Sequence, residues 1–188
     1  MTGVSGILLA AGSARRFGAP KLLQPLHDGL PVAAVAAQTL AQVLPDTWAV
    51  VKPGDHALIE LFTALGLHII ENPRADEGMG TSLAAGVNAS VNSITQGWLI
   101  TLADMPWIQA TTISALANRL ENGASIVAPL YEGRRGHPVG FSSHWFKSLA
   151  ELRGDKGARD LIVENANAIE LLTTADTGVL KDIDYPDD

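Results

Sequence analysis

Short apolar runs alternate along the chain with longer segments in which apolar and small residues recur at helical spacing. Residues 7–9 and 48–51 form continuous apolar runs typical of strands that are buried in a sheet, and residues 67–70 are predicted to be a third strand. Residues 31–43, which begin with a proline, and residues 56–65, which are followed by a glycine, are predicted to be helices. This alternation favours a parallel sheet with helices on both faces.

The second part of the chain continues the pattern, with one change of direction. An apolar strand beginning at residue 97 ends just before an aspartate, and the turn at 131–136 predicts that the strand after it is antiparallel. The remaining predicted elements are helices at 112–120 and 143–152, and strands at 124–130, 137–141 and 168–173. We therefore expect a three-layer α/β/α fold whose Rossmann-like sheet is mostly parallel, with a small antiparallel addition.

Length and composition predict a single domain, because 188 residues that are 47% hydrophobic can bury one core. The net charge of -7 argues against nucleic acid as a partner, because binding to a phosphate backbone requires a basic face. The chain has no cysteine, no apolar run approaching eighteen residues and no basic-then-apolar start. We therefore expect a cytoplasmic protein without disulfides, thiolate metal sites or a membrane segment.

Most of the positive charge is concentrated in a few loops. Eight of the 13 basic residues lie in three short segments: Arg15, Arg16 and Lys21; Arg134 and Arg135; Arg153, Lys156 and Arg159. An acidic protein that gathers its cations in this way is expected to bind a local anionic ligand. For any one of these clusters, solvated loop charge is the alternative.

A glycine-rich loop follows the first predicted strand. Ala10, Ala11 and Gly12 are small enough for a ligand to lie against the backbone, whose N–H groups can donate to phosphate oxygens. Arg16 and Lys21 supply positive charge. The spacing L-A-A-G-x-x-x-R-x-G-x-x-K fits neither the dinucleotide fingerprint nor the Walker loop.

Asp104 is the second candidate centre, because it follows the apolar strand that begins at residue 97. Ligands of open α/β sheets bind beyond the carboxyl ends of the strands, so Asp104 should face the same crevice as the first loop. A carboxylate there suits Mg²⁺, which accepts one or two carboxylates together with phosphate oxygens and water. The alternative is that Asp104 caps the next helix, a position for which Thr111 is better placed.

These motifs resemble the signature of the molybdenum-cofactor nucleotidyltransferases, the family of molybdopterin cytidylyl- and guanylyltransferases. The L-A-A-G loop carries the resemblance together with L-A-D-M-P at 102–106 and G-M-G-x-S-L at 78–83. The resemblance implies the nucleotide-diphospho-sugar transferase type of fold, a catalytic set of Arg16, Lys21 and Asp104, and Mg²⁺ on Asp104, with Mn²⁺ as a substitute. It implies nucleotide contacts from Leu9, Ala10, Ala11, Gly12, Ser13, Lys21, Gly80 and Ser82.

Ser82 lies near the start of the helix predicted at 78–86, where it could either cap the helix or contact a ligand. Gly78 and Gly80 permit close backbone approach, Thr81 or Ser82 can cap the helix, and its first N–H groups are expected to be free for a ligand. By resemblance, Ser82 reads the edge of the nucleotide base. Capping alone is the alternative for its hydroxyl.

The resemblance divides the chain into a nucleotide-binding half, 1–105, and an acceptor-binding half, 106–188. It places His137, Lys156 and Arg159 on the molybdopterin side. Lys156 and Arg159 are predicted at the head of a helix, where cations oppose the dipole, which favours an anion between them. D-I-D-Y-P at 182–186 resembles the family's closing motif, although a tyrosine replaces threonine, and makes Asp184 a second magnesium ligand. A disordered acidic tail is the alternative.

The resemblance implies that CTP and molybdenum-bound molybdopterin give molybdopterin cytosine dinucleotide and pyrophosphate. Ala11 and the G-H-P at 136–138 favour CTP. A molybdoenzyme or its chaperone is an expected partner. The alternatives are transfer from GTP, transfer to a sugar phosphate, and a non-catalytic protein that delivers the cofactor to a molybdoenzyme. A dinucleotide-dependent oxidoreductase is disfavoured by the missing G-x-G-x-x-G.

Overall fold

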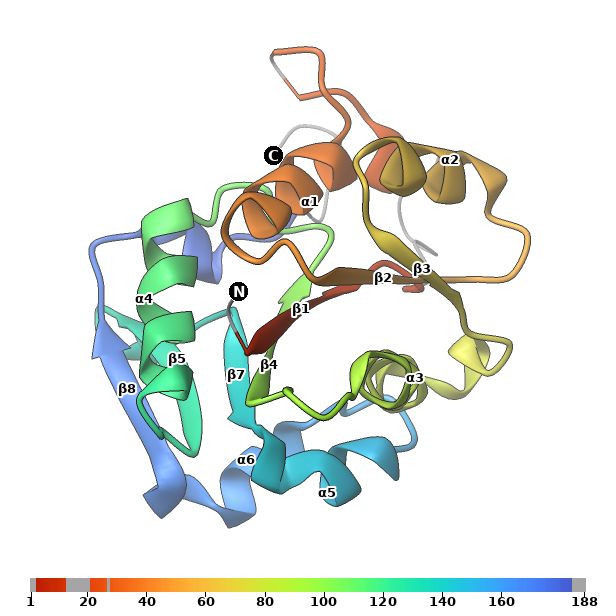
Figure 1. Ribbon diagram of the computed structural model, residues 1–188. Helices are drawn as coiled ribbons and strands as arrows, with labels where there is room; N and C mark the ends of the chain where they lie inside the picture. Colours follow the sequence, from red (N-terminus) through yellow and green to blue (C-terminus); the bar gives the residue numbers. More distant parts are fainter. Residues whose placement is uncertain (1–2, 13–20, 27, 184–188) are drawn as a thin grey trace.

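A mixed β-sheet forms the middle layer of the molecule (Figure 1). The computed structural model describes residues 3–12, 21–26 and 28–183. In these residues the sheet has eight strands in the order β3-β2-β1-β4-β7-β5-β6, with β8 paired to β5. The strands are β1 (Val4–Leu9), β2 (Thr47–Val51), β3 (His68–Glu71), β4 (Gly97–Leu102), β5 (Ile126–Tyr131), β6 (Arg134–Arg135), β7 (Val139–Ser142) and β8 (Ile169–Thr173).

Helices cover both faces of this sheet, as the alternating pattern predicts (Figure 1). On one face lie α1 (Val32–Val43), α2 (His56–Ala64) and α4 (Ala110–Glu121). On the other lie α3 (Met79–Ser90), α5 (Phe146–Ala150) and α6 (Arg159–Glu164). The two faces enclose separate hydrophobic cores. The predicted three-layer α/β/α fold is confirmed.

β1 lies at the centre of both cores. Leu8 faces the core under α1 and α4, whereas its neighbours Ile7 and Leu9 face the core under α3. A strand buried on both faces must be apolar at every position rather than at alternate positions, which explains the continuous run. β1 pairs in parallel with β2 on one side and β4 on the other.

The connections change direction at β1. The chain moves outward from β1 through β2 to β3, and α3 then returns across the opposite face to β4. The strand order therefore reverses at β1, although α1 and α4, the helices that follow β1 and β4, pack on the same face of the sheet. Such a switch point opens a crevice at the carboxyl ends of the two strands.

The second part of the chain agrees with the prediction in direction and differs from it in detail. β7 is antiparallel to both β4 and β5, and β8 is parallel to β5. The predicted helix at 143–152 is shorter, because a 3₁₀ turn at Ser143–Trp145 precedes α5. In the described residues, no helix has the length and apolar character needed to cross a membrane.

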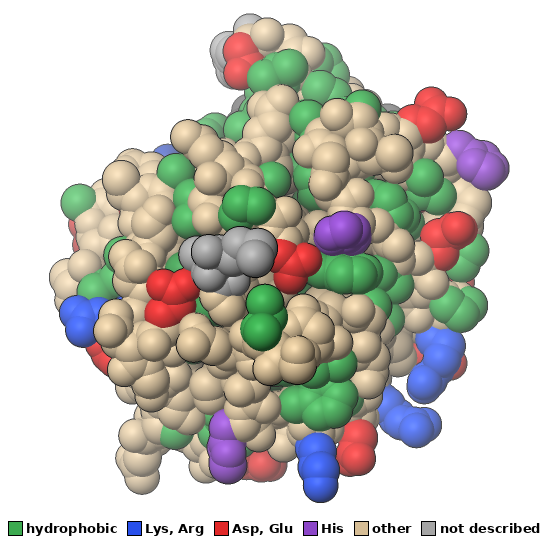
Figure 2. Space-filling view, in the orientation of Figure 1, with side chains coloured by type: hydrophobic (Ala, Val, Ile, Leu, Met, Phe, Trp, Pro, Cys, Tyr) green, Lys and Arg blue, Asp and Glu red, His purple; other side chains and the backbone are tan. Residues whose placement is uncertain are grey.

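Acidic, basic and apolar side chains are interspersed on the face shown in Figure 2. The charges that bear on function are those lining cavities.

Candidate active site

The register between β1 and β4 brings the two candidate centres together. Leu9 is the partner of Leu102, and the N–H of Ala103 donates to the carbonyl of Leu9 at 3.0 Å. Residues that follow these two leucines therefore leave the sheet side by side. Gly12 and Asp104 consequently line the same cavity, as the crevice argument predicts.

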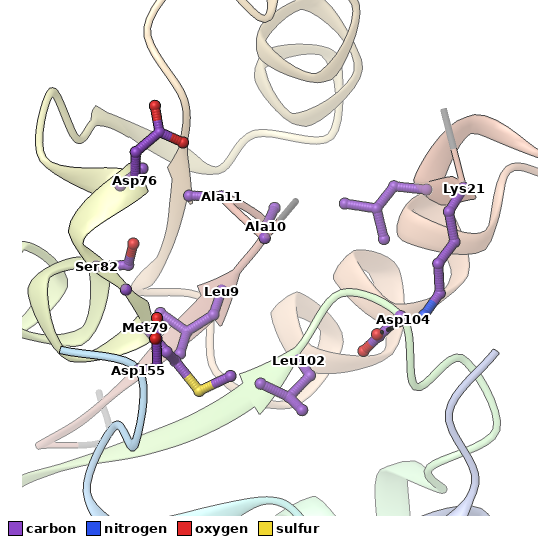
Figure 3. Close-up of a pocket in the computed structure, with 14 residues that line it drawn as sticks. Leu9, Ala10, Ala11, Lys21, Asp76, Met79, Ser82, Leu102, Asp104 and Asp155 are labelled. Carbon is purple, nitrogen blue, oxygen red and sulfur yellow. Dashed lines mark hydrogen bonds and ion pairs between the residues drawn. The ribbon is translucent and has the colours of Figure 1, made fainter. Parts of the chain in front are cut away.

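This cavity, here called the strand-end pocket, has a volume of about 440 Å³ (Figure 3). Lys21 and Asp104 form one side of it, and Ser82, Met79 and Asp155 form the other, with the end of β1 between them. The complete lining is Leu9, Ala10, Ala11, Gly12, Lys21, Leu22, Ala75, Asp76, Gly78, Met79, Ser82, Leu102, Asp104 and Asp155.

An ion pair joins the two charged residues expected at the phosphates. Lys21 Nζ lies 2.9 Å from Asp104 Oδ2, and the side chains are only 13% and 26% exposed. Among the described residues, the Asp104 carboxylate has no hydrogen bond or ion pair other than the one with Lys21. The pair places a cation and a carboxylate side by side in the pocket.

The donor chemistry of the pocket fits a Mg²⁺ ion that shares its ligands with phosphate. The described residues contain no group of three His, Cys, Asp or Glu side chains that would form a metal site made by the protein alone. Mg²⁺ commonly uses one or two carboxylates and takes its remaining ligands from phosphates and water. Asp104 satisfies that requirement.

Asp104 is not used to cap a helix. α4 begins at Ala110, and the carboxylate of Asp176 accepts hydrogen bonds from Gln109 N–H at 2.8 Å and from the hydroxyl of Thr112 at 2.7 Å. The prediction that Thr111 caps this helix is wrong, because Thr111 already lies within the first turn. A distant carboxylate supplies the stabilisation instead.

The start of α3 differs from the prediction in its hydrogen bonds. Gly78 is the residue that precedes the helix, and neither Thr81 nor Ser82 caps it. The N–H of Gly80 is not free, because it donates to the carbonyl of Gly154 at 2.8 Å. Gly80 is therefore covered by the chain, whereas Gly78 and Met79 line the pocket.

Ser82 is held in place from the adjoining loop. The side-chain amide of Asn72 donates to the hydroxyl oxygens of both Thr81 and Ser82 at 3.0 Å. The Thr81 hydroxyl in turn donates to backbone carbonyls, while the Ser82 hydroxyl has no acceptor among the described residues. Ser82 thus presents a hydroxyl donor to the pocket.

A second cavity of about 220 Å³, here called the histidine pocket, adjoins the first. The two cavities share Leu9, Met79 and Leu102. The histidine pocket brings His137 together with Lys156 and Arg159, which come from a later segment, and adds Arg135. Its other lining residues are Leu83, Ile100, Gly136, Val139, Phe141, Gly157, Ala158 and Ile162.

His137 is uncharged at neutral pH. Burial lowers its pKa below the ordinary value of 6.5, and the charge of Arg135 lowers the pKa further, against the smaller opposite effects of Asp104 and Asp182. Its Nδ1 atom is buried and has no hydrogen-bond partner among the residues that the structure describes. The imidazole is therefore a neutral hydrogen-bonding group rather than a cation for phosphate.

Lys156 differs from its expected surroundings. α6 begins at Arg159, so Lys156 precedes the helix, and its ammonium group lies 2.9 Å from Asp160 Oδ2. The protein itself therefore supplies a counter-charge that the sequence argument lacked. Both side chains of this pair are exposed, which leaves the interaction weak.

The closing motif reaches Asp104 through the backbone. The N–H of Ile183 donates to the carbonyl of Asp104 at 3.0 Å, and Ile183 is buried. Ser13, Arg16 and Asp184, which the sequence also nominates, lie outside the described residues.

An α/β sheet with a charged pocket at its switch point, joined to a second cationic pocket, offers adjoining places for two anionic ligands. Comparison with known proteins identifies the enzyme class as nucleotidyltransferase. Residues 6–169 match the model of the MobA-like NTP transferase domain, and the chain belongs to that family.

Three curated relatives support this assignment. The chain is 31% identical to the purine catabolism protein PucB of Bacillus subtilis, over 97% of this chain and 92% of that protein. It is 29% identical to nicotine blue oxidoreductase of Paenarthrobacter nicotinovorans, over 96% and 92% of the respective chains. A probable molybdenum cofactor guanylyltransferase of Bacillus cytotoxicus is 27% identical over 72% of this chain and 66% of that protein.

A solved structure agrees in fold and sequence. Rv0371c of Mycobacterium tuberculosis H37Rv superposes with a TM-score of 0.83 at 26% identity, covering 98% of this chain and 93% of that chain. A second structure of Rv0371c contains manganese; it superposes with a TM-score of 0.74 at 25% identity, covering 91% and 88% of the two chains.

Proposed function

We propose that the protein transfers a cytidylyl group from CTP to molybdenum-bound molybdopterin, giving molybdopterin cytosine dinucleotide and pyrophosphate. The observation that carries the proposal is the pair of adjoining cavities that share Leu9, Met79 and Leu102. One cavity offers the Lys21–Asp104 pair, and the other offers the Arg159 cation beside a neutral His137. Two substrates that occupied these cavities would meet at the shared wall.

The strand-end pocket is assigned to the nucleotide. Backbone at Leu9, Ala10, Ala11 and Gly12 lies against it, and Lys21 binds the phosphates. Ser82 donates to the base. From outside the described residues, Ser13 contributes to the same loop and Arg16 adds positive charge. Gly80 contributes by holding the start of α3 rather than through a free N–H group.

Asp104 would hold Mg²⁺ or Mn²⁺, and Asp184 is proposed as a second ligand. The ion, when bound, would neutralise negative charge on the phosphates. A phosphate monoester acceptor is already anionic, so its oxygen can attack the α-phosphorus without a general base. A new P–O bond forms, the α–β bridging bond breaks, and pyrophosphate leaves. Lys21 and Arg16 stabilise the charge that develops.

The histidine pocket is assigned to the acceptor. Its cations, Lys156 and Arg159, would attract the acceptor phosphate, and His137 would hydrogen-bond to the pterin. In this proposal, residues 1–105 serve mainly the nucleotide and 106–188 mainly the acceptor. The protein would act in the cytoplasm and would pass its product to a molybdoenzyme or a chaperone of one.

Discrimination between CTP and GTP is assigned to the side chain at residue 11. Ala11 is buried where the chain leaves β1, and its methyl group narrows the pocket against a purine. One methyl group is worth about 1–3 kcal/mol of discrimination. The guanylyltransferase among the relatives keeps transfer from GTP as the leading alternative.

Pyrophosphate release tests the proposal. The purified protein is supplied with Mg²⁺ and one of CTP, GTP, UTP or ATP, with and without molybdenum-bound molybdopterin. We expect release from CTP only when the acceptor is present. Preferential release from GTP would favour the guanylyl alternative, and acceptor binding without release from any nucleotide would favour cofactor delivery.

A further inference from the structure

Asp155 lies in the loop between α5 and α6 and lines the strand-end pocket. Its side chain is on the wall formed by Met79 and Ser82, across the pocket from Lys21 and Asp104 (Figure 3). The next two residues, Lys156 and Gly157, line the histidine pocket instead. Asp155 therefore belongs to the nucleotide side of the boundary between the two cavities.

Close backbone packing holds the loop that carries Asp155. The carbonyl of Gly154 accepts the hydrogen bond from Gly80 at the start of α3. A Cβ atom at Gly80 would lie 2.7 Å from the carbonyl oxygen of Arg153, and one at Gly78 would clash with the backbone of Gly154. Because two glycines allow this contact, the position of Asp155 relative to Ser82 is well defined.

The carboxylate of Asp155 has no partner within the described residues. The other acidic side chains of the pocket each have a lysine: Asp104 lies 2.9 Å from Lys21, and Asp76 lies 2.7 Å from Lys52. An uncompensated carboxylate would repel a triphosphate. It is therefore expected to face the part of the nucleotide that carries no negative charge.

We propose that Asp155 determines base specificity by accepting a hydrogen bond from the exocyclic amino group of cytosine. This inference rests on the proposed binding of CTP in the strand-end pocket. Carboxylates pair with the N4 amino group of cytosine, whereas uracil carries a carbonyl oxygen at that position and would be repelled. One such contact discriminates between bases on the order of tenfold to a hundredfold. The hydroxyl of Ser82, on the same wall, adds a donor for another base edge.

Asp155→Asn tests this assignment, because an amide can turn either its oxygen or its NH₂ group toward the base. We expect the ratio of kcat/KM for CTP to that for UTP, measured by pyrophosphate release at saturating acceptor, to fall at least tenfold. The dissociation constant for CMP divided by that for UMP, measured by calorimetry without metal or acceptor, should rise by a similar factor. Glu151→Gln is the matched control, because it removes an exposed carboxylate from the same loop outside both pockets; its ratios should remain at the wild-type values.

A folded Asp155→Asn variant with wild-type base ratios would overturn the proposal. Weakened Mn²⁺ binding with unchanged base ratios would assign Asp155 to the metal and would also overturn it. If the wild-type protein releases no pyrophosphate from any nucleotide, the proposed function fails while the CMP and UMP titrations still decide the role of Asp155. A wild-type protein that binds CMP and UMP equally, or neither, contradicts the proposal directly.

Discussion

Replacing Asp104 by asparagine removes one charge from the Lys21–Asp104 pair and leaves the shape of the site nearly unchanged. At 2.9 Å, the attraction between the two groups is about 6 kcal/mol for an effective dielectric constant of about 20. The cost of desolvating two largely buried groups offsets most of this attraction. We therefore expect the free energy of unfolding to fall by about 2 kcal/mol, because Lys21 is left without its carboxylate.

The loss of activity should be much larger than the loss of stability. Asparagine is a poor substitute for a carboxylate that binds a divalent ion, and the transition state would lose about 4 kcal/mol, or about a thousandfold in rate. Pyrophosphate release measures the rate. Thermal unfolding measures stability, and a loss of 2 kcal/mol in a chain of this size lowers Tm by about 4–8 °C.

Glu170→Gln is the matched control, because it breaks an ion pair with Arg119 that lies away from both pockets. The two side chains of that pair are 53% and 45% exposed, so the loss should stay below about 1 kcal/mol. Turnover in this variant should match the wild type. Near-normal turnover in Asp104→Asn, or equal stability losses in the two variants, would refute the reasoning.

Three further variants test neighbouring parts of the account. His137→Gln should flatten the dependence of the free energy of unfolding on pH. Because the pKa of His137 in the folded chain lies below 6.5, the unfolded chain takes up the proton first, and the wild type loses stability as pH falls below that value. Urea unfolding at about pH 7.5 and about pH 5.5 measures the loss, and an equal loss in the variant and the wild type would contradict the prediction. Gly80→Ala should lower the free energy of unfolding in urea by about 1–3 kcal/mol and raise the KM for CTP, because the added methyl group would clash with the backbone of Arg153. Unchanged stability would show that the loop moves to accommodate the methyl group without cost. Arg159→Gln should raise the KM for the acceptor about tenfold and leave the KM for CTP unchanged. The control Arg119→Gln should change neither KM value. An equal rise of both KM values in Arg159→Gln would contradict the assignment of the histidine pocket to the acceptor.

The central part of the fold follows from local sequence rules. The run that became β1 is apolar at successive positions because both faces of the strand are buried, and the same reasoning predicts β2. Parallel strands end at the same edge of a sheet, so the sequence alone predicts that the loop after β1 and Asp104 face one crevice. These predictions needed only periodicity and a general rule of topology.

Contacts between distant segments could not be predicted in this way. The position of Asp155 depends on Gly80, which is far from it in the sequence and binds its loop through the backbone. The stabilisation of α4 comes from Asp176, whose carboxylate replaces the local cap expected at Thr111. Sequence patterns report neighbours along the chain, whereas these features depend on neighbours in space.

The central claim is that a nucleoside triphosphate binds where the ends of β1 and β4 meet. A crystal structure with Mg²⁺ and α,β-methylene-CTP, which cannot release pyrophosphate, tests it most directly. The account predicts phosphates between Gly12 and Asp104, with the cytosine on the Ser82 side of the pocket. A nucleotide bound instead at the amino ends of the strands, in the cavity beside Gly3 and Asp46, would contradict it.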